Sequence, residues 1–130
     1  MLARLAQTGQ ERTYPNHLQH SQRIPMKLID AIFMSPHMPD DFVICAREPF
    51  HQGSEAVIVQ FGENFSIPPE VTHQGYTYFL ETDGVTELLE MISQKRSSRE
   101  TKADFVCYYA SWDAYPAFYN DLEDVAAPSR

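Results

Sequence analysis

Three short segments of the chain have the composition and spacing of β-strands. Residues 42–46 (FVICA) and 55–61 (EAVIVQF) are apolar and β-branched, and residues 76–81 (YTYFLE) alternate aromatic with other side chains. β-Branched and aromatic residues favour strands, and neighbouring strands joined by a short loop favour antiparallel pairing. The pattern therefore predicts three strands in a small, mainly antiparallel sheet.

Two other segments space their apolar residues along one face of a helix. Within residues 26–33 (MKLIDAIF) one helical face is shared by Leu28, Ile29, Ile32 and Phe33, and Ser35-Pro36 is expected to end the helix. In residues 84–95 (GVTELLEMISQK) apolar residues recur at i, i+3, i+4 and i+7, and Asp83 is the expected N-cap. Each segment predicts a helix that packs through one face.

A third helix is predicted after residue 96, because Ser97 and Glu100 match a capping box. The helical spacing continues through Ala103, Val106, Cys107 and Ala110. Phe105, Tyr109 and Trp112 form a second apolar stripe beside the first. The apolar arc is therefore wide, which predicts a helix that is either deeply buried or partly an interface.

The order of these elements predicts one α+β domain, with a three-stranded sheet packed by helices on one face. The other face is expected to be solvated or to meet a second copy. The domain is assigned to residues 26–122, because Met26 begins the first patterned segment. Residues 1–25 are polar and aperiodic and are expected to form an N-terminal arm, and residues 123–130 are expected to form a C-terminal tail.

Charge is distributed unevenly along the 130 residues. Three arginines and one glutamate give residues 1–25 a net charge of +2, whereas seven basic and 17 acidic residues give residues 26–130 a net charge of −10. A nucleic-acid-binding surface is basic, so direct nucleic-acid binding is disfavoured. An acidic surface attracts a basic protein partner, although acidity also serves solubility alone.

Cys45 and Cys107 both lie in apolar stretches, where cysteine behaves as a small buried hydrophobe. A reducing cytoplasm suits them, although sequence alone does not decide whether they form a disulfide. The N-terminal stretch has no apolar signal-peptide core, and the chain has no run of 18 apolar residues. A cytoplasmic protein that does not cross a membrane is therefore expected.

Signatures of catalysis are weak. The chain has no GxSxG elbow and no glycine-rich run before a helix, so neither a serine nucleophile nor a phosphate-binding loop is predicted. His37, His51 and His73 lie in three separate loops, and with Glu55 or Glu70 they could form a hydrolytic metal site if the fold brought them together. Close ligand spacing is absent, so solvated loop histidines are favoured, and neither a metal nor a cofactor is predicted.

The C-terminal segment 108–121 is rich in aromatic and acidic residues. Tyrosine and tryptophan are favoured at protein interfaces, and aspartates there can pair with arginine or lysine of a partner. The alternative is that the aromatics join the core, and Trp112 is the residue expected to do so first. The predicted partner-binding residues are Tyr108, Trp112, Asp113, Tyr115, Phe118, Tyr119 and Asp121.

Residues 26–116 resemble a family of small bacterial domains of unknown function. The resemblance is carried by MKLIDAIF, MPDDFVICAREPF, SEAVIVQF, IPPEV, GYTYFLET and YYASWDAYP. It implies a bacterial origin and a compact α+β domain, and it supplies no catalytic residues or cofactor.

Two classes of function remain open on this sequence. The first is a non-enzymatic binding protein of the immunity or inhibitor type, which acts on a basic partner such as a toxin or nuclease. The second is a small metal-dependent hydrolase that uses the loop histidines. A structural homodimer formed through the second sheet face is compatible with either.

Overall fold

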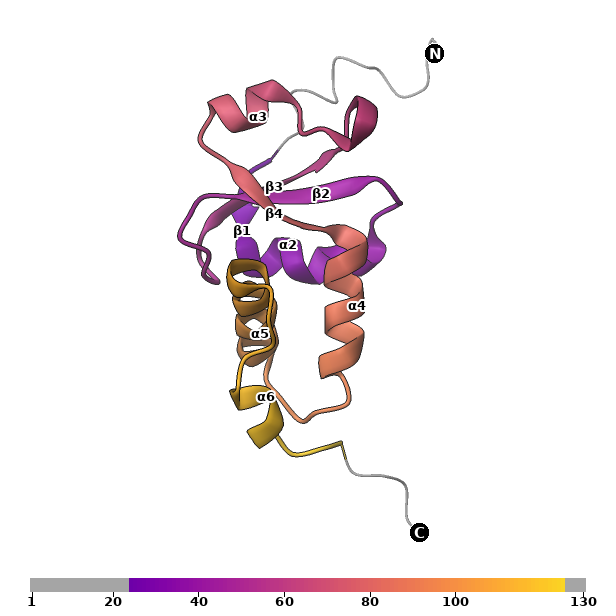
Figure 1. The fold of residues 1–130 in the computed structure, drawn as a ribbon, viewed down its shortest axis with the longest axis vertical. Helices are drawn as coiled ribbons and strands as arrows, with labels where there is room; N and C mark the ends of the chain where they lie inside the picture. Colours follow the sequence, from indigo (N-terminus) through magenta and orange to yellow (C-terminus); the bar gives the residue numbers. More distant parts are fainter. Residues whose placement is uncertain (1–23, 126–130) are drawn as a thin grey trace.

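The structure, a computed structural model, describes residues 24–125, so the predicted N-terminal arm lies almost wholly outside the described residues. Four strands form one antiparallel sheet in the order β1–β3–β2–β4 (Figure 1). They are β1 (Met26–Lys27), β2 (Phe42–Ala46), β3 (Glu55–Gln60) and β4 (Thr77–Glu81). The predicted α+β class and the three predicted strands are confirmed.

The predicted strand count is wrong, because the sheet has a fourth strand at the start of the segment MKLIDAIF. Met26 and Lys27 are not helical but pair with Ala56 and Glu55 as the edge strand β1. Lys27 is extended, and the backbone N–H of Leu28 donates to the carbonyl of Ser54 at 2.7 Å. A strand of two residues is too short to show the alternation of apolar and polar residues by which strands are predicted.

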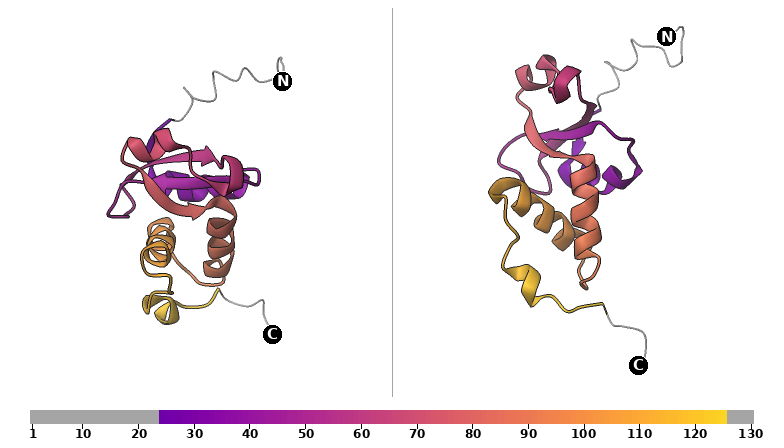
Figure 2. Two further views of the ribbon diagram at one scale, coloured as in Figure 1. Left: turned by 45° about the horizontal axis from the view of Figure 1, so that its top comes forward. Right: turned by 45° about the vertical axis from the view of Figure 1, so that its right-hand side comes forward.

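Three helices pack on one face of the sheet (Figures 1 and 2). They are α2 (Leu28–Met34), which the 3₁₀ turn Ser35–His37 continues, α4 (Thr82–Ile92) and α5 (Arg99–Trp112). Their apolar faces meet alternate residues of the strands, including Ile44 of β2 and Phe79 of β4, in the larger core cluster. The predicted arrangement of this layer is confirmed.

The second sheet face is covered rather than open, so the expectation of a solvated or dimerising face is wrong. Residues 61–76 fold over it with the short turn η2 (Glu63–Phe65) and helix α3 (Pro69–His73), above the sheet in Figure 1. Val43 and Cys45 of β2 are fully buried there against Val71 and Tyr76. Helices therefore lie on both faces of the sheet. Within residues 24–125 no bare sheet face is left through which a homodimer could form.

Both predicted N-caps are wrong. Glu81 occupies the N-cap position of α4 without a side-chain hydrogen bond, and Asp83 lies inside the first turn. Ser98, not Ser97, caps α5, and its Oγ accepts the N–H of Thr101 at 3.0 Å. The backbone conformation at the turn selects the capping residue, and spacing alone does not reveal it.

After α5 the described chain forms a short helix, α6 (Phe118–Asp121), and then returns to the loop between α4 and α5. The N–H of Arg96 donates to the carbonyl of Glu123 at 2.7 Å, and the N–H of Val125 donates to Gln94 at 2.8 Å. Residues 123–125, assigned to the tail from sequence, are thus hydrogen-bonded to the domain. Within residues 24–125 no helix combines the length and apolar character needed to span a bilayer.

Candidate protein-binding surface

Tyr108 and Trp112 lie one turn apart on the outer side of α5. Their side chains are 40% and 68% exposed, and their ring centroids are 6.4 Å apart. The expectation that Trp112 joins the core is wrong. Trp112 is the last residue of α5, beyond the part of the helix that packs on the sheet through Phe105 and Val106.

Asp113 ends α5 and turns the chain back across it. Its backbone is left-handed at φ 53°, and its N–H donates to the carbonyl of Tyr109 at 2.8 Å. The turn brings the Tyr115 ring to 5.9 Å from Phe105 and to 5.4 Å from Tyr109. Tyr115 is nevertheless 53% exposed, so one side of this aromatic cluster faces solvent.

Electrostatic repulsion links Asp113 to the aromatic cluster. The negative charge of Asp113 raises the pKa of the Tyr109 hydroxyl, with smaller contributions from burial, from Tyr115 and from a hydrogen bond to Asp113.

Phe118 and Tyr119 are partly buried and pack against the larger core cluster, whereas Trp112 is exposed. The Tyr119 ring lies 5.3 Å from Phe105, and Lys95 Nζ lies 5.1 Å from its centroid. Asp121 is exposed at the end of α6. The structure thus divides the seven predicted residues into five that are accessible to a partner and two that support the fold.

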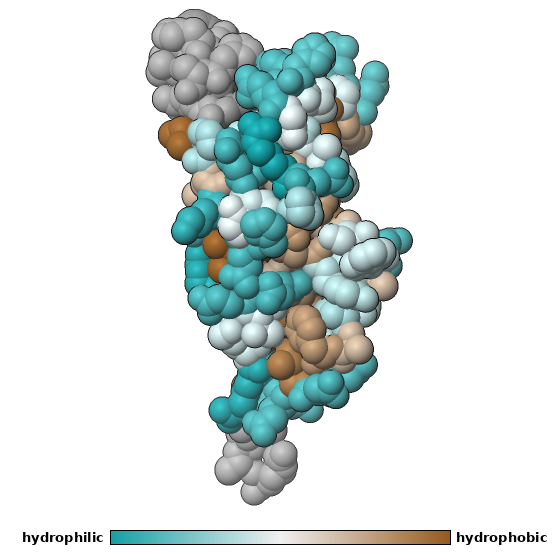
Figure 3. Space-filling model, turned by 90° about the vertical axis from the view of Figure 1, so that its left-hand side faces the viewer, coloured by the Kyte–Doolittle hydropathy of each residue, from teal (hydrophilic) through white to brown (hydrophobic). Residues whose placement is uncertain are grey.

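We define the aromatic–acidic surface as Tyr108, Trp112, Asp113, Tyr115 and Asp121. Figure 3 looks onto the left-hand side of Figure 1, the side nearest α5 and α6. Hydrophilic and intermediate residues cover most of that face, and hydrophobic ones form small separate patches on it. Aromatic residues set among polar ones are typical of protein-binding surfaces.

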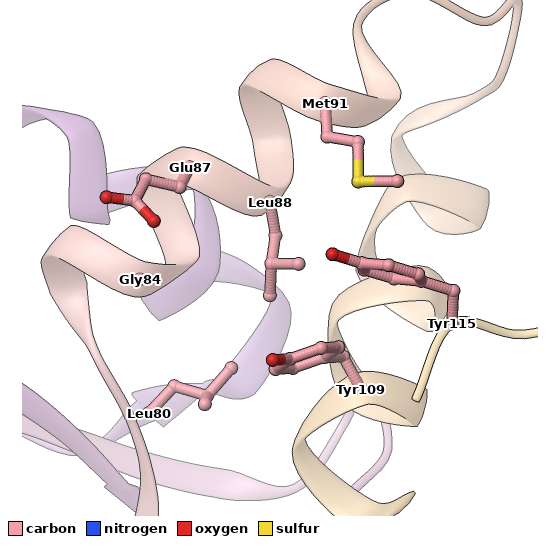
Figure 4. A pocket seen from close by; sticks show the side chains of 7 residues that line it. All are labelled: Leu80, Gly84, Glu87, Leu88, Met91, Tyr109 and Tyr115. Carbon is pink, nitrogen blue, oxygen red and sulfur yellow. The ribbon is translucent and has the colours of Figure 1, made fainter. Parts of the chain in front are cut away.

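A pocket of about 160 Å³ lies between α4 and α5, next to Tyr115 (Figure 4). Leu80, Leu88 and Met91 give it apolar walls, and Tyr109 and Tyr115 line the α5 side. Gly84 and Glu87 line it on α4. The sequence did not reveal this pocket. The pattern of apolar residues along α4 predicts which face is buried, but not that α5 lies opposite and leaves a space between the two helices.

Half of the basic side chains in the described part of the chain form ion pairs within the fold. Residues 24–125 hold six basic and 17 acidic residues, a net charge of −11. Three of the basic side chains form ion pairs: Arg47 with Glu55 at 3.6 Å, Arg99 with Asp30 at 2.9 Å and Lys95 with Asp124 at 2.8 Å. Asp83, Glu87 and Glu90 are exposed on one side of α4. The surface around the pocket is therefore negative.

The three histidines of the described residues do not assemble a metal site. His37, His51 and His73 are exposed, and no group of three or more histidine, cysteine or acidic side chains within residues 24–125 could hold a metal ion. His51 serves its own turn, since its Nδ1 accepts the N–H of Gly53 at 3.2 Å.

Both cysteines are buried and form no disulfide. Burial, with a smaller contribution from the charge of Asp104, raises the pKa of the Cys107 thiol to about 12. The thiolate, which is the nucleophilic form, is therefore scarce at neutral pH.

Comparison with known proteins gives no match to a family model, to a curated protein or to a solved structure. The fold and the surface therefore define the chain only as a small, acidic α+β domain with an exposed aromatic–acidic surface. The resemblance of residues 26–116 to a bacterial domain family stays a prediction.

Proposed function

We propose that the protein is a non-enzymatic binding module of the immunity or inhibitor type, which recognises a basic protein partner through the aromatic–acidic surface. The observation that carries the proposal is the exposed pair of Tyr108 and Trp112 beside Asp113. A toxin or nuclease with a positively charged active site is the kind of partner that this chemistry fits.

The exposed aromatic rings support a role in binding. Trp112 is the single tryptophan of the chain and is 68% exposed, although tryptophan is usually buried. Its large, rigid ring gains contact area on binding at little cost in side-chain entropy. Tyr108 and Tyr115 extend the same surface with hydroxyl groups that can hydrogen-bond to a partner.

The distribution of charge supports a basic partner. The net charge of −11 over residues 24–125 attracts a cationic protein over a distance of about 10 Å at moderate salt. Asp113 interacts with Tyr109 of the aromatic cluster, and Asp121 adds an exposed carboxylate at the end of α6. Charge-assisted hydrogen bonds from arginine or lysine to such carboxylates are strong once water is excluded.

We propose the cytoplasm as the location. Buried cysteines that form no disulfide support it, because reducing compartments keep thiols in that form.

Affinity capture of the tagged full chain from its native host, at low and then at high salt, tests the proposal. We expect one strongly basic protein to be retained at low salt and released as salt screens the attraction. Repeated captures that recover no basic protein, or one whose retention is indifferent to salt, would contradict it.

A further inference from the structure

The sheet ends at β4, whose outer edge is not paired with any other strand of the described residues. β4 pairs with β2 along one side and is the last strand in the order β1–β3–β2–β4. Figure 1 shows it crossing in front of the other strands, with α4 and α5 below it. Thr77 is exposed, and Tyr78 is 46% exposed. An unpaired edge of this kind is a template on which an extended segment of another protein adds a strand.

The pocket between α4 and α5 lies beneath the same edge. Its lining includes Leu80 of β4 but no residue of β1, β2 or β3. The register between β2 and β4 shifts at Phe79, and both Phe79 and Leu80 pack on the helix side of the sheet. Directly opposite residues of two paired strands point to the same face. A strand added outside β4 therefore carries one side chain beside Leu80, on the side of the pocket.

The pocket fits one uncharged, mainly apolar side chain. Five side chains surround it in Figure 4: Leu80, Leu88, Met91, Tyr109 and Tyr115. The Glu87 carboxylate points away from both tyrosines, beyond Leu88, and the Tyr109 hydroxyl already interacts with Asp113. The volume of about 160 Å³ is close to the roughly 150 Å³ of an apolar protein cavity that holds one benzene molecule.

Acidic side chains lie at the end of this edge. Glu81, the last residue of β4, and Asp83 in the first turn of α4 are both exposed. Glu81 is opposite Val43, which belongs to the smaller core cluster, so Glu81 lies on the other face of the sheet from Leu80. Side chains of an added strand alternate in the same way. The residue next to the one in the pocket therefore lies beside Glu81, where a basic side chain meets a carboxylate.

We propose that the basic partner adds an extended segment to the outer edge of β4, with an apolar side chain in the pocket and a neighbouring lysine or arginine beside Glu81. The segment runs antiparallel to β4, as in the strand pairs already present in the sheet. The inference rests on the proposed function and states how the partner is held. Tyr115 belongs both to the pocket and to the aromatic–acidic surface, so the two sites are continuous. Backbone hydrogen bonds give such a complex affinity, and alternate side chains give it specificity.

A second copy of the chain is a poorer occupant of this edge. Residues 24–125 of each copy carry a net charge of −11, so two copies repel each other. The register shift at Phe79 also disturbs regular pairing of one β4 with another, which is a common protection of sheet edges. A basic segment with an apolar anchor has favourable charge and packing that offset this disturbance.

The test is titration of the isotope-labelled full chain with the peptide acetyl-Thr-Lys-Leu-Thr-Val-Thr-amide, followed by NMR. We expect nuclear Overhauser contacts between the peptide backbone and residues 77–80, and chemical-shift changes at Gly84 and Tyr115. Alanine in place of the leucine is expected to weaken binding at least about tenfold, because apolar contact in the pocket is lost. Methylation of the peptide nitrogens one at a time is expected to weaken binding at alternate residues only, because every second N–H faces β4.

Two sets of variants locate the segment on the protein. Gly84→Leu fills the pocket and is expected to remove the preference for leucine over alanine in the peptide. If that variant does not fold, Gly84→Ala replaces it, since a Cβ at Gly84 meets no atom within 4 Å, and it is expected to reduce the preference. Glu81→Gln is expected to weaken the peptide about threefold, whereas Glu90→Gln, with the same charge change farther along α4, leaves its affinity unchanged.

The outcomes separate this inference from the proposed function. Absence of contacts to residues 77–80, equal binding of the leucine and alanine peptides, or equal weakening by methylation at every residue overturns the strand addition. Contacts between copies at residues 77–80 without peptide assign the edge to a second copy and overturn it too. If the captured partner binds Gly84→Leu and Glu81→Gln at full affinity, the strand addition fails while the proposed function stands. If capture recovers no basic protein but the peptide adds to β4 as expected, the proposed function fails and the edge retains its chemistry.

Discussion

At the scale of single residues, Trp112 shows what spacing along a helix does not reveal. Phe105, Tyr109 and Trp112 share one stripe of α5, yet Phe105 is fully buried and Trp112 is 68% exposed. The stripe on α5 continues beyond the part of the helix that packs against the core. Where that packing stops is decided by the tertiary structure, not by the spacing of residues along the helix. The same holds for Tyr115, which only the turn at Asp113 brings back onto Phe105.

This difference in burial predicts a large loss of stability on truncation of Phe105 and almost none on truncation of Trp112. Phe105→Ala is expected to lower the free energy of unfolding by about 3–4 kcal/mol, because it leaves a cavity in the core. Trp112→Ala is expected to change it by less than about 0.5 kcal/mol, as is usual for an exposed position. Urea unfolding of both variants checks this. A loss of more than about 2 kcal/mol for Trp112→Ala would restore the core interpretation.

At the scale of elements, the sequence predicts the strands and helices of the larger core, because period-2 and period-3.6 patterns reflect burial on one face. It misses β1, whose two residues carry no period, and the covering segment 61–76. Phe61, Ile67, Val71 and Tyr76 cover the second sheet face at irregular intervals, interrupted by two prolines. The pocket between α4 and α5 is also missed, because it depends on how the two helices lie side by side.

The start of α5 supplies a matched pair of substitutions. Ser98→Ala removes the side chain that accepts the N–H of Thr101 and is expected to cost about 1 kcal/mol of stability. Ser97→Ala is expected to cost nothing or to stabilise slightly, because the Ser97 hydroxyl is buried without a hydrogen-bond partner. Thermal and urea unfolding of the two variants measure the difference. Equal losses, or a larger loss for Ser97→Ala, would show that Ser97 is the cap.

At the scale of the whole molecule, the buried Cys107 thiol and two tyrosine hydroxyls with raised pKa values predict sensitivity to alkaline pH. The pKa of Cys107 is raised from 9.0 to about 12 by burial and by Asp104. Burial likewise raises the pKa of Tyr76 and Tyr78. The unfolded chain ionises first as pH rises, so stability is complete below about pH 9 and falls between pH 9 and 12.

For Cys107 alone the expected loss between pH 9 and 10 is about 1 kcal/mol. Urea unfolding of the protein and of Cys107→Ala across this range measures it. The variant is expected to start from a lower stability at pH 7 and to lose less with rising pH. Identical pH profiles for the two proteins would show that Cys107 does not contribute.

The account as a whole rests on the claim that the aromatic–acidic surface is the binding surface. The most direct test measures the dissociation constant of the captured partner for the unmodified protein, Trp112→Ala and Phe65→Ala. Both substituted side chains are exposed aromatics, 68% and 72% respectively, and Phe65 lies on the segment that covers the opposite sheet face. We expect Trp112→Ala to weaken binding at least about 30-fold, as a central interface residue does, and Phe65→Ala to leave it unchanged. Equal affinity of all three proteins, or a larger loss for Phe65→Ala, would contradict the account.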